Sequence, residues 1–206
     1  MNSSYQTIIE NSASDPRWDD FLSGLEYSHY EQSTCWAKVK QHQGWKAMRL
    51  KVLKGSDWLA GAQMLCKRLP VGGLIGYIPS GPFYTNPDDQ SLDVLVRSIN
   101  NLARKRRIQY VVITPYVENE YLDKILKKNG YAPTQEILPP IATTRATLIL
   151  DLSKDLDALL MNMRYETRRE IKLALKSELT IREGDKKDLD TLFRLMSIVA
   201  EKRGER

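Results

Sequence analysis

The 206-residue sequence contains few residues that ligate metals through nitrogen or sulfur: two cysteines, Cys35 and Cys66, and two histidines, His29 and His42. A structural zinc site needs about four such ligands at close spacing, and no CxxC pair occurs. We therefore expect no metal site, and reduced thiols as in a cytoplasmic protein. A catalytic Cys35–His42 dyad is also disfavoured, because the helical rise separates the two residues by about 10 Å.

Long apolar runs and common catalytic motifs are missing as well. Nowhere do about 18 consecutive apolar residues occur, and the N-terminal segment has no basic leader, so we expect a soluble, cytosolic protein. The motifs GxSxG, GxxxxGK[ST], HExxH and GxGxxG are absent, which removes support for nucleophile-elbow hydrolases, P-loop enzymes and zinc proteases. The net charge of +5 is mild and mixed in sign, so charge alone names no partner.

Strand and helix signals alternate over the first 131 residues. The segment KGSD at 54–57 joins two apolar strands as a hairpin, so the sheet should be mixed and largely antiparallel, flanked by helices, in an α/β (α+β) fold. The strand at 108–115 has the continuous apolar pattern of a buried strand. The expected strands are residues 5–10, 46–53, 58–69, a strand within 72–82 and 108–115. The expected helices are residues 14–25, 33–43, 88–107 and 118–131.

A domain boundary is predicted near EILPPIATTR, where Pro139 and Pro140 break regular structure. We place a first domain at 1–142 and the beginning of a second at 143–206. The second should contain a strand at 146–153, one long helix at 155–177, a strand at 179–183 and a helix at 186–203. About sixty residues do not easily close a core, so this domain is expected to be cut short or to lean on the first.

Trp36 and Lys40 are four residues apart in the helix predicted at 33–43, so an aromatic plate and an ammonium group should share a face. Such a pair can stack on a sugar or base while binding a phosphate. The structural alternative is that Trp36 packs in the core with Val39, while Lys38 and Lys40 are solvated. Both interpretations remain open, and Trp45 is expected only to begin the next strand.

Three further segments have a possible binding role and a structural alternative. The predicted long helix has a basic stripe on one face, which either serves a ligand or is merely solvated. Its other face should be core. Tyr77 to Tyr84, YIPSGPFY, forms a rigid loop at a strand end, a common place for ligands, although a bare turn would look similar. The segment RKRR at 104–107 is explained by the helix dipole, with an RNA-facing role as the lesser alternative. The stripe is Arg164, Arg168, Lys172 and Lys176; the core face is Leu156, Leu159, Leu160, Met163 and Ile171.

Four segments, taken in order, resemble the FemABX family, whose members build peptidoglycan interpeptide bridges from aminoacyl-tRNA. The segments are QSTCWAKVK (32–40), GGLIGYIPSGP (72–82), KKNGY (127–131) and TLILDLSKDLDALLMNMRYETRREIKLA (147–174). The resemblance implies tandem GNAT-like (acetyltransferase-like) domains, of which this chain would be an N-terminal portion. It also implies a muropeptide or lipid-linked precursor as acceptor substrate, aminoacyl-tRNA as co-substrate, no cofactor, and peripheral association with the inner membrane through the lipid-linked substrate.

By the same resemblance, the diphosphate of the acceptor substrate is bound by Lys40, with Lys38 as second choice. A second diphosphate ligand is placed at Arg168, with Arg169 as second choice. Tyr77 and Trp36 are expected to add acceptor contacts. An amine that attacks an activated ester needs positioning and loss of a proton rather than a covalent nucleophile, and no catalytic base is assigned.

This sequence departs from the family pattern at two places. Ser80 stands where the family loop commonly has an arginine, and Asn86 and Asp88 lie where it has an acid.

The sequence leaves two alternative functions open. The first is an acyl-CoA-dependent GNAT acyltransferase of exopolysaccharide or lipid metabolism, since one fold hosts several donors. Such enzymes bind the CoA pyrophosphate with a glycine-rich loop, and these 206 residues contain none. The second is a noncatalytic module that binds RNA or another anion through RKRR and the basic stripe, although its basic residues are scattered among acids.

Overall fold

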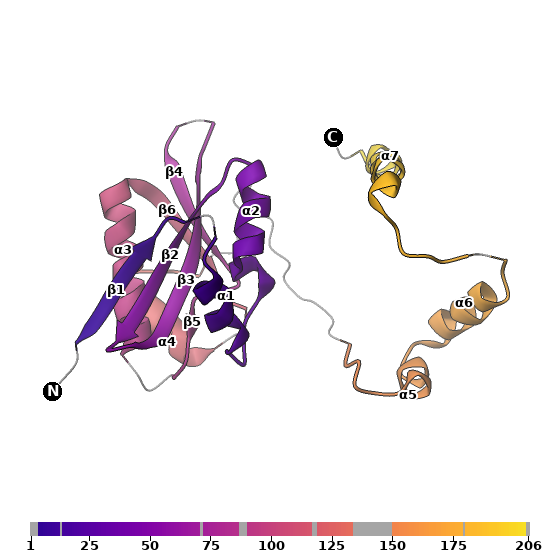
Figure 1. Ribbon diagram of the computed structural model, residues 1–206, viewed down its shortest axis with the longest axis horizontal. Helices are drawn as coiled ribbons and strands as arrows, with labels where there is room; N and C mark the ends of the chain where they lie inside the picture. The colour runs from indigo at the N-terminus through magenta and orange to yellow at the C-terminus, as the bar shows by residue number, and fades with distance from the viewer. Residues whose placement is uncertain are drawn as a thin grey trace. The chain divides into compact units, whose positions relative to one another are not determined.

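The computed structural model describes residues 4–12, 14–70, 72–86, 90–116, 119–133, 150–178 and 180–204. The chain divides into two units, residues 1–145 and 146–206, which are described separately (Figure 1). The segment in which a boundary was predicted, 136–145, lies outside the described residues. The division at 142/143 therefore stays a prediction.

The first unit is built on a mixed sheet with the strand order β1-β2-β3-β4-β6 (Figure 1). The first four strands pair antiparallel, β6 pairs parallel with β4, and short β5 pairs with β3. This confirms the predicted mixed, largely antiparallel sheet. The strands are β1 (Tyr5–Glu10), β2 (Lys46–Lys54), β3 (Asp57–Arg68), β4 (Leu74–Pro79), β5 (Phe83–Tyr84) and β6 (Ile108–Thr114).

Helices cover both faces of this sheet. One face packs against α3, and alternate residues of β2 and β3, including Leu50, Val52 and Met64, form its core. The other face packs against α1 and α2 through clusters around Trp18 and Trp45. Local capping starts these helices, since Asp15 caps α1 and Ser33 caps α2. The helices are α1 (Pro16–Ser23), η1 (Tyr30–Gln32), α2 (Thr34–His42), α3 (Ser91–Arg106) and α4 (Glu120–Lys128).

The strand predicted at 108–115 is confirmed as β6, but the prediction that it is buried is wrong. Among the described residues β6 pairs only with β4, at the edge of the sheet, and Tyr110 is 62% exposed. An apolar run shows that a segment avoids water on average, but it does not count the strands beside it. Val111 to Thr114 are accordingly only half-buried.

The second unit contains helices in its described part: α5 (Leu156–Met161), α6 (Tyr165–Leu175), η2 (Lys186–Asp188) and α7 (Leu189–Lys202). The single helix predicted at 155–177 is wrong, because the chain leaves helical geometry before Tyr165. Asn162 ends α5, and Arg164, with φ −61° and ψ 153°, is the extended N-cap of α6. Asparagine competes with helical hydrogen bonds, and Glu166 in the first turn favours a new helix start.

This break also changes the predicted stripe and core face. Arg164 and Lys176 are the two caps of α6, so the four basic residues do not lie along one continuous helix. Of the five predicted core residues only Leu159 is buried, and Leu156 is 83% exposed. Helical spacing identifies an apolar face, but burial also requires a partner for that face.

In the described part of this unit the two predicted strands are not formed, whereas the last predicted helix is. Residues 150–153 and 180–183 form no strand, because no described segment of the unit offers a strand to pair with; 146–149 and 179 lie outside the described residues. The helix predicted at 186–203 is confirmed as η2 followed by α7. No helix in the described part of the chain is long and apolar enough to cross a membrane.

Candidate ligand-binding site

Lys40 lies over the ring of Trp36, with its Nζ atom 4.8 Å from the ring centroid. The helix that holds them starts at Ser33, whose hydroxyl accepts the Trp36 N–H at 3.2 Å. Lys40 Nζ also donates to Gln43 Oε1 at 3.1 Å, which leaves two of its three N–H bonds for a ligand. The predicted shared face of Trp36 and Lys40 is therefore confirmed.

Trp36 packs against the core, which is one of the two roles weighed for it, while its stacking on a ligand stays a prediction. Its ring is half-buried and packs against the cluster of Trp45, Leu65, Ile75 and Tyr77. Val39, predicted to pack with it, is 45% exposed because it lies on the solvent side of α2; Lys38 is exposed as well. Trp45 does more than begin a strand, since it is buried with its ring 6.3 Å from that of Tyr77.

Tyr77 lies in the core between β4 and α2, with only 8% of its surface exposed. Burial raises the pKa of its hydroxyl, and Thr114 Oγ1 donates to the phenol oxygen at 3.2 Å. The phenol therefore stays neutral and is already hydrogen-bonded within the protein. Its predicted contact with the acceptor substrate stays a prediction.

Gln32, the last residue of η1, links the segment before α2 to β3 and to the end of β4. Its side chain is fully buried and acts as a substitute for a neighbouring strand: Oε1 accepts from Gln63 N at 2.6 Å, and Nε2 donates to Gln63 O at 3.1 Å. The same Nε2 donates to Pro79 O at 2.6 Å, just beyond the point where β3 and β4 stop pairing at Leu65 and Tyr77. The sequence alone does not indicate this role, because a buried glutamine has no local signature.

The loop after β4 is held against this glutamine. A Cβ atom at Gly81 would lie 3.0 Å from Gln32 Cδ, so glycine allows the close approach. Ser80 has a positive φ of 48°, and its hydroxyl donates to Glu31 Oε2 at 2.7 Å. Serine at the position of the family arginine therefore ties the loop to the segment before α2.

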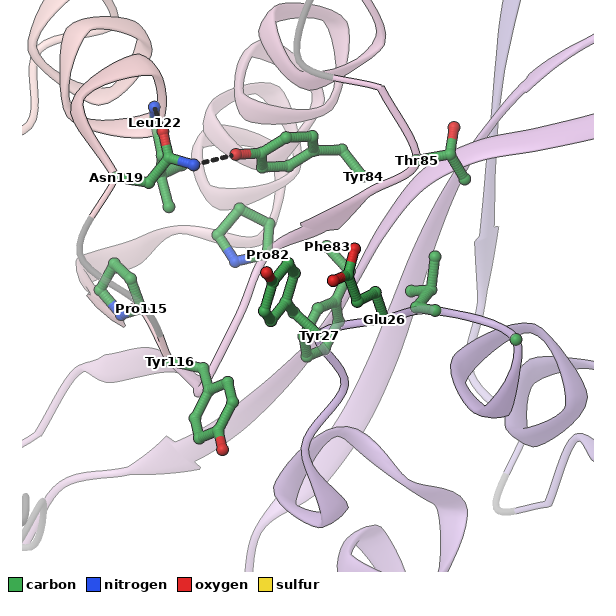
Figure 2. A pocket seen from close by; sticks show the side chains of 12 residues that line it. Glu26, Tyr27, Pro82, Phe83, Tyr84, Thr85, Pro115, Tyr116, Asn119 and Leu122 are labelled. Carbon is green, nitrogen blue, oxygen red and sulfur yellow. Dashed lines mark hydrogen bonds between the residues drawn. The ribbon is translucent and has the colours of Figure 1, made fainter. Parts of the chain in front are cut away.

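A cavity of about 480 Å³ opens on the first unit beside this loop (Figure 2). It is walled by the segment after α1, the β5 region, the segment after β6 and the start of α4. Part of the predicted YIPSGPFY loop contributes, whereas Lys40, Trp36 and Tyr77 do not. The lining residues are Gly24, Leu25, Glu26, Tyr27, Pro82, Phe83, Tyr84, Thr85, Pro115, Tyr116, Asn119 and Leu122.

A row of aromatic rings connects this cavity with Lys40. Tyr116 at the cavity lies 4.8 Å from the ring of His29, which lies 4.4 Å from that of Tyr30. Tyr30 in turn meets Trp36 edge-on at 5.3 Å. The cavity and the Lys40–Trp36 pair are thus two ends of one aromatic surface. The sequence predicted the Lys40 end but not the histidine and tyrosines that extend it.

Arg168 and Arg169 belong to the second unit. Arg168 is half-buried and donates from Nη1 to the carbonyl of Met161 at 2.9 Å, which ties α6 to the end of α5; Arg169 is exposed. Their roles toward a diphosphate stay predictions.

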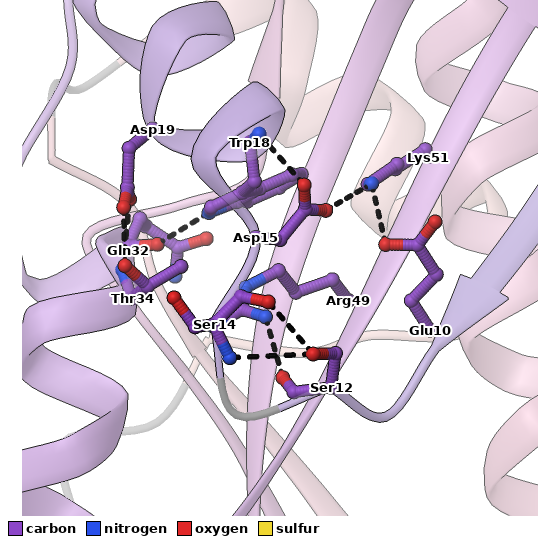
Figure 3. Close-up of polar contacts among 10 residues, drawn as sticks. All are labelled: Glu10, Ser12, Ser14, Asp15, Trp18, Asp19, Gln32, Thr34, Arg49 and Lys51. Carbon is purple, nitrogen blue, oxygen red and sulfur yellow. Dashed lines mark hydrogen bonds and ion pairs between the residues drawn. The ribbon is translucent and has the colours of Figure 1, made fainter.

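Beneath α1, a buried charge cluster supports the first unit (Figure 3). Lys51, 1% exposed, binds Glu10 at 2.6 Å and also Asp15, and its ammonium lies 4.3 Å from the centre of the Trp58 ring. Burial alone would raise the pKa of the Asp15 carboxyl, but hydrogen bonding and the charge of Lys51 outweigh it and lower the pKa to about 2. This charge cluster, in which Lys51 and Asp15 are buried and Glu10 is partly exposed, anchors the start of α1.

The chain resembles known proteins both in sequence and in fold. The FemAB family model matches residues 14–139. Lipid II:glycine glycyltransferase of Staphylococcus aureus is 28% identical over 197 residues, covering 90% of this chain and 46% of that protein. The crystal structure of FemX is 25% identical with a TM-score of 0.82, covering 98% of this chain and 51% of that one.

The fold is also shared more widely. An aminoglycoside N-acetyltransferase solved with CoA, 12% identical, has a TM-score of 0.50 over 71% of this chain and 98% of its own. This likeness concerns the fold alone and confirms a GNAT-like architecture. The chain spans about half the length of the curated relatives it matches. Because the family model covers more than half of its residues and the FemX structure agrees, the chain belongs to the FemAB family.

Proposed function

We propose that this chain is the acceptor-binding part of an aminoacyltransferase that moves an amino acid from aminoacyl-tRNA to a peptidoglycan precursor in cell-wall bridge synthesis. Family membership and the similarity to a lipid II:glycine glycyltransferase support this reading. The observation that carries it is the Lys40 ammonium held over Trp36 at 4.8 Å, at one end of an aromatic surface. A lipid-linked or nucleotide-linked muropeptide offers the diphosphate and rings that suit this surface.

The chemistry of the Lys40 end fits a diphosphate next to a ring. The two remaining N–H bonds of the ammonium can donate to phosphate oxygens, and charge-assisted bonds of this kind are stronger than neutral ones. Tyr30, 62% exposed beside Trp36, offers a face for a base or sugar. Binding in this place would hold the acceptor substrate while its amine attacks the ester of the donor, a reaction in which positioning is the main requirement.

The proposal is tested by binding of a UDP-muropeptide, followed by tryptophan fluorescence. Lys40→Met should weaken binding about tenfold or more, because a hydrogen bond to a charged group is worth about 1.5–3 kcal/mol. Lys38→Met is the matched control on the same helix and should leave the affinity nearly unchanged. Equal affinity in both variants and the unmodified chain would sink the assignment, and an effect at Lys38 alone would move the phosphate contact there.

The second predicted phosphate ligand is tested in the same assay. Arg168→Met should lower the affinity for the UDP-muropeptide, whereas Arg169→Met should not. Because Arg168 also bonds the carbonyl of Met161, helix content is followed by circular dichroism. A loss of affinity with unchanged helix content supports a direct contact; unchanged affinity removes Arg168 from the site.

The donor is tested separately, in the transferase of which this chain is the proposed acceptor-binding part, by supplying the muropeptide with either labelled aminoacyl-tRNA or acyl-CoA. Product formed only with aminoacyl-tRNA is the expected result. Acyl transfer from acyl-CoA without tRNA would replace the proposal by a GNAT-type acyltransferase.

A further inference from the structure

Four strand ends and two helix ends meet at one end of the sheet in the first unit. β2 begins at Lys46, which pairs with Cys66 near the end of β3. Arg68, the last residue of β3, pairs with Leu74 at the start of β4. Leu74 in turn pairs with Ile108 at the start of β6. Because α2 shortly precedes β2 and α3 directly precedes β6, the C-termini of both helices also lie at this end (Figure 1).

The segments that build this end of the sheet are strongly basic. Residues 32–56, 58–87 and 94–117 contain no aspartate or glutamate. The dipole of α3 favours the basic run at 104–107, but it does not explain the basic side chains that lie on strands. We call this surface the basic end. Its cations are Lys46, Lys67, Arg68 and the four residues at 104–107, all exposed except Lys67, which is half-buried.

An apolar turn projects from the basic end. The hairpin between β3 and β4 is closed by two hydrogen bonds of 3.0 Å, from the Leu69 N–H to Gly73 O and from the Gly72 N–H to Leu69 O. Leu69 is half-buried and Pro70 is exposed. In the view of Figure 1 this hairpin extends past the ends of α2 and α3. The most prominent part of the basic end is therefore apolar and follows directly on the cation of Arg68.

We propose that the basic end binds the surface of a bilayer that contains anionic phospholipids, with the β3–β4 turn entering the head-group region. Cations that come from three strands and a helix are spread over a surface, which suits an extended anionic surface better than one compact anion. Anionic head groups attract clustered lysine and arginine side chains, and apolar side chains enter the boundary between head groups and acyl chains. An RNA backbone would use the cations but not the apolar turn. Since no helix in the described part of the chain can cross a membrane, the contact is peripheral.

The inference deepens the proposed function and rests on it in one respect, the role of Lys40. This residue lies in the last turn of α2, the turn nearest the basic end. A diphosphate bound there would lie at the membrane-facing end of the aromatic surface, so a lipid attached to it would remain in the bilayer. The rest of the precursor would extend past Tyr30 and His29, away from the bilayer.

The experiment uses the whole chain and two kinds of vesicle, neither of which contains a peptidoglycan precursor. One consists of phosphatidylcholine, and the other of phosphatidylcholine with phosphatidylglycerol. Binding is measured by cosedimentation. The chain should bind the anionic vesicles at least about tenfold more tightly, and added salt should reduce this preference, because the surface potential decays within a Debye length. Equal binding to both kinds of vesicle would overturn the inference.

Variants locate the binding surface. The double variant Arg68→Gln and Lys105→Gln should weaken binding to anionic vesicles about twentyfold, because each cation near such a surface contributes about fivefold. The matched control, Arg17→Gln and Lys54→Gln, removes the same charge from α1 and from the far end of β2. It should change the affinity no more than about twofold, because those charges lie outside the contact. Equal losses in the two double variants would overturn the inference, and tighter binding of a short RNA duplex would overturn it in favour of nucleic acid.

A fluorescent label tests the orientation. Pro70→Cys is labelled with an environment-sensitive dye in a Cys35→Ser background, in which the remaining Cys66 is buried. Ser56→Cys, in the turn between β2 and β3 at the opposite end of the sheet, is the matched control. Anionic vesicles should shift the emission to the blue at position 70 and not at position 56. Equal shifts at both positions, or a shift at position 56 alone, would overturn the assignment to the basic end.

A soluble ligand separates this inference from the proposed function. The Arg68→Gln and Lys105→Gln variant should bind a UDP-muropeptide with nearly the affinity of the unmodified chain, because neither residue belongs to the Lys40 site. If the unmodified chain binds the UDP-muropeptide but does not prefer anionic vesicles, the membrane assignment alone is rejected. If it prefers anionic vesicles but does not bind the UDP-muropeptide, the proposed function is rejected and the membrane assignment stands.

Discussion

The two units of the chain differ in how far their apolar side chains are buried. In the first, Leu50, Leu95 and Ile99 are completely buried between the sheet and α3. In the second, Ile181 is 96% exposed and Phe193 on α7 is 73% exposed. Both units have amphipathic helices of ordinary composition. The difference is that the helices of the first unit have a sheet against which their apolar faces can pack.

The two units should tolerate substitutions differently. Packing in the first unit places charges and glycines under constraint, because neighbours surround them closely. Side chains of the second unit, within its described part, are mostly surrounded by solvent. Equivalent substitutions in the two units should therefore differ in effect. All four tryptophans lie between residues 18 and 58, so tryptophan fluorescence reports the first unit selectively.

The largest contrast should come from ion pairs. Lys51→Met leaves Asp15 and Glu10 without their buried partner, and breaking such a pair costs about 3–5 kcal/mol in the free energy of unfolding. Urea denaturation followed by tryptophan fluorescence measures the loss. The matched change in the second unit is Arg182→Met, which removes the exposed pair with Asp188 at 2.7 Å. Because tryptophan fluorescence reports only the first unit, this variant is followed by circular dichroism at 222 nm, and it should show no measurable change, as expected for exposed pairs. Comparable losses in both variants would contradict the contrast.

The next effect concerns the buried amide of Gln32. Gln32→Leu keeps the approximate volume of the side chain. It leaves the N–H and C=O of Gln63 and the carbonyl of Pro79 without their side-chain partner. Each unsatisfied group costs about 1–3 kcal/mol, so a total loss of at least about 3 kcal/mol is expected in the same urea assay. Gln41→Leu, on the exposed side of α2, is the control and should be nearly neutral. If Gln32→Leu unfolds at the urea concentration of the unmodified chain, the amide does not bridge the strands.

A smaller effect should appear on acidification. The pKa of Asp15 is about 2 in the folded chain and near 3.8 when unfolded, so between these values the unfolded state binds more protons. The contribution of Asp15 to the free energy of unfolding should therefore be fully present above about pH 4. It should fall by about 2 kcal/mol as the pH decreases from about 4 to 2. Asp15→Asn should flatten this dependence in urea titrations at several pH values. An unchanged slope in the variant would assign the acid sensitivity to other groups.

Local chemistry explains which features the sequence could predict. Caps such as Asp15 and Ser33 act within three residues, and the Lys40–Trp36 pair follows from helical spacing alone. Arg49 and Lys51 alternate with apolar residues in β2, a pattern typical of a solvent-facing strand side, yet both are buried because α1 and the segment before it cover them. Covering by a distant segment leaves no mark on the local pattern.

Only part of the cavity lining could be predicted, because local patterns do not show which distant segments meet. Its Pro82–Tyr84 wall belongs to a loop whose rigidity is visible in the sequence, whereas Glu26, Tyr116 and Asn119 reach it from three other segments. Only the fold brings them together. The length of the second unit's first helix was mispredicted because helical periodicity continues across Asn162 while the backbone does not.

The smallest expected contrast is between two glycines. A Cβ atom at Gly61 would lie 2.7 Å from Trp18 Cζ3 and 3.2 Å from the carbonyl of Leu50, while one at Gly184 would meet Asp188 only at 3.4 Å. Gly61→Ala should cost about 1–2 kcal/mol, because the buried indole that donates to Gln32 O at 2.7 Å has no free space to move into. Gly184→Ala should change stability by no more than about 0.5 kcal/mol. Urea denaturation reads the first variant by fluorescence, and circular dichroism at 222 nm reads the second. If Gly61→Ala proves neutral, the sheet under α1 adapts to the added methyl group more readily than the complete burial of Trp18 implies. The two units would then differ less in their tolerance to substitution than in the exposure of their side chains.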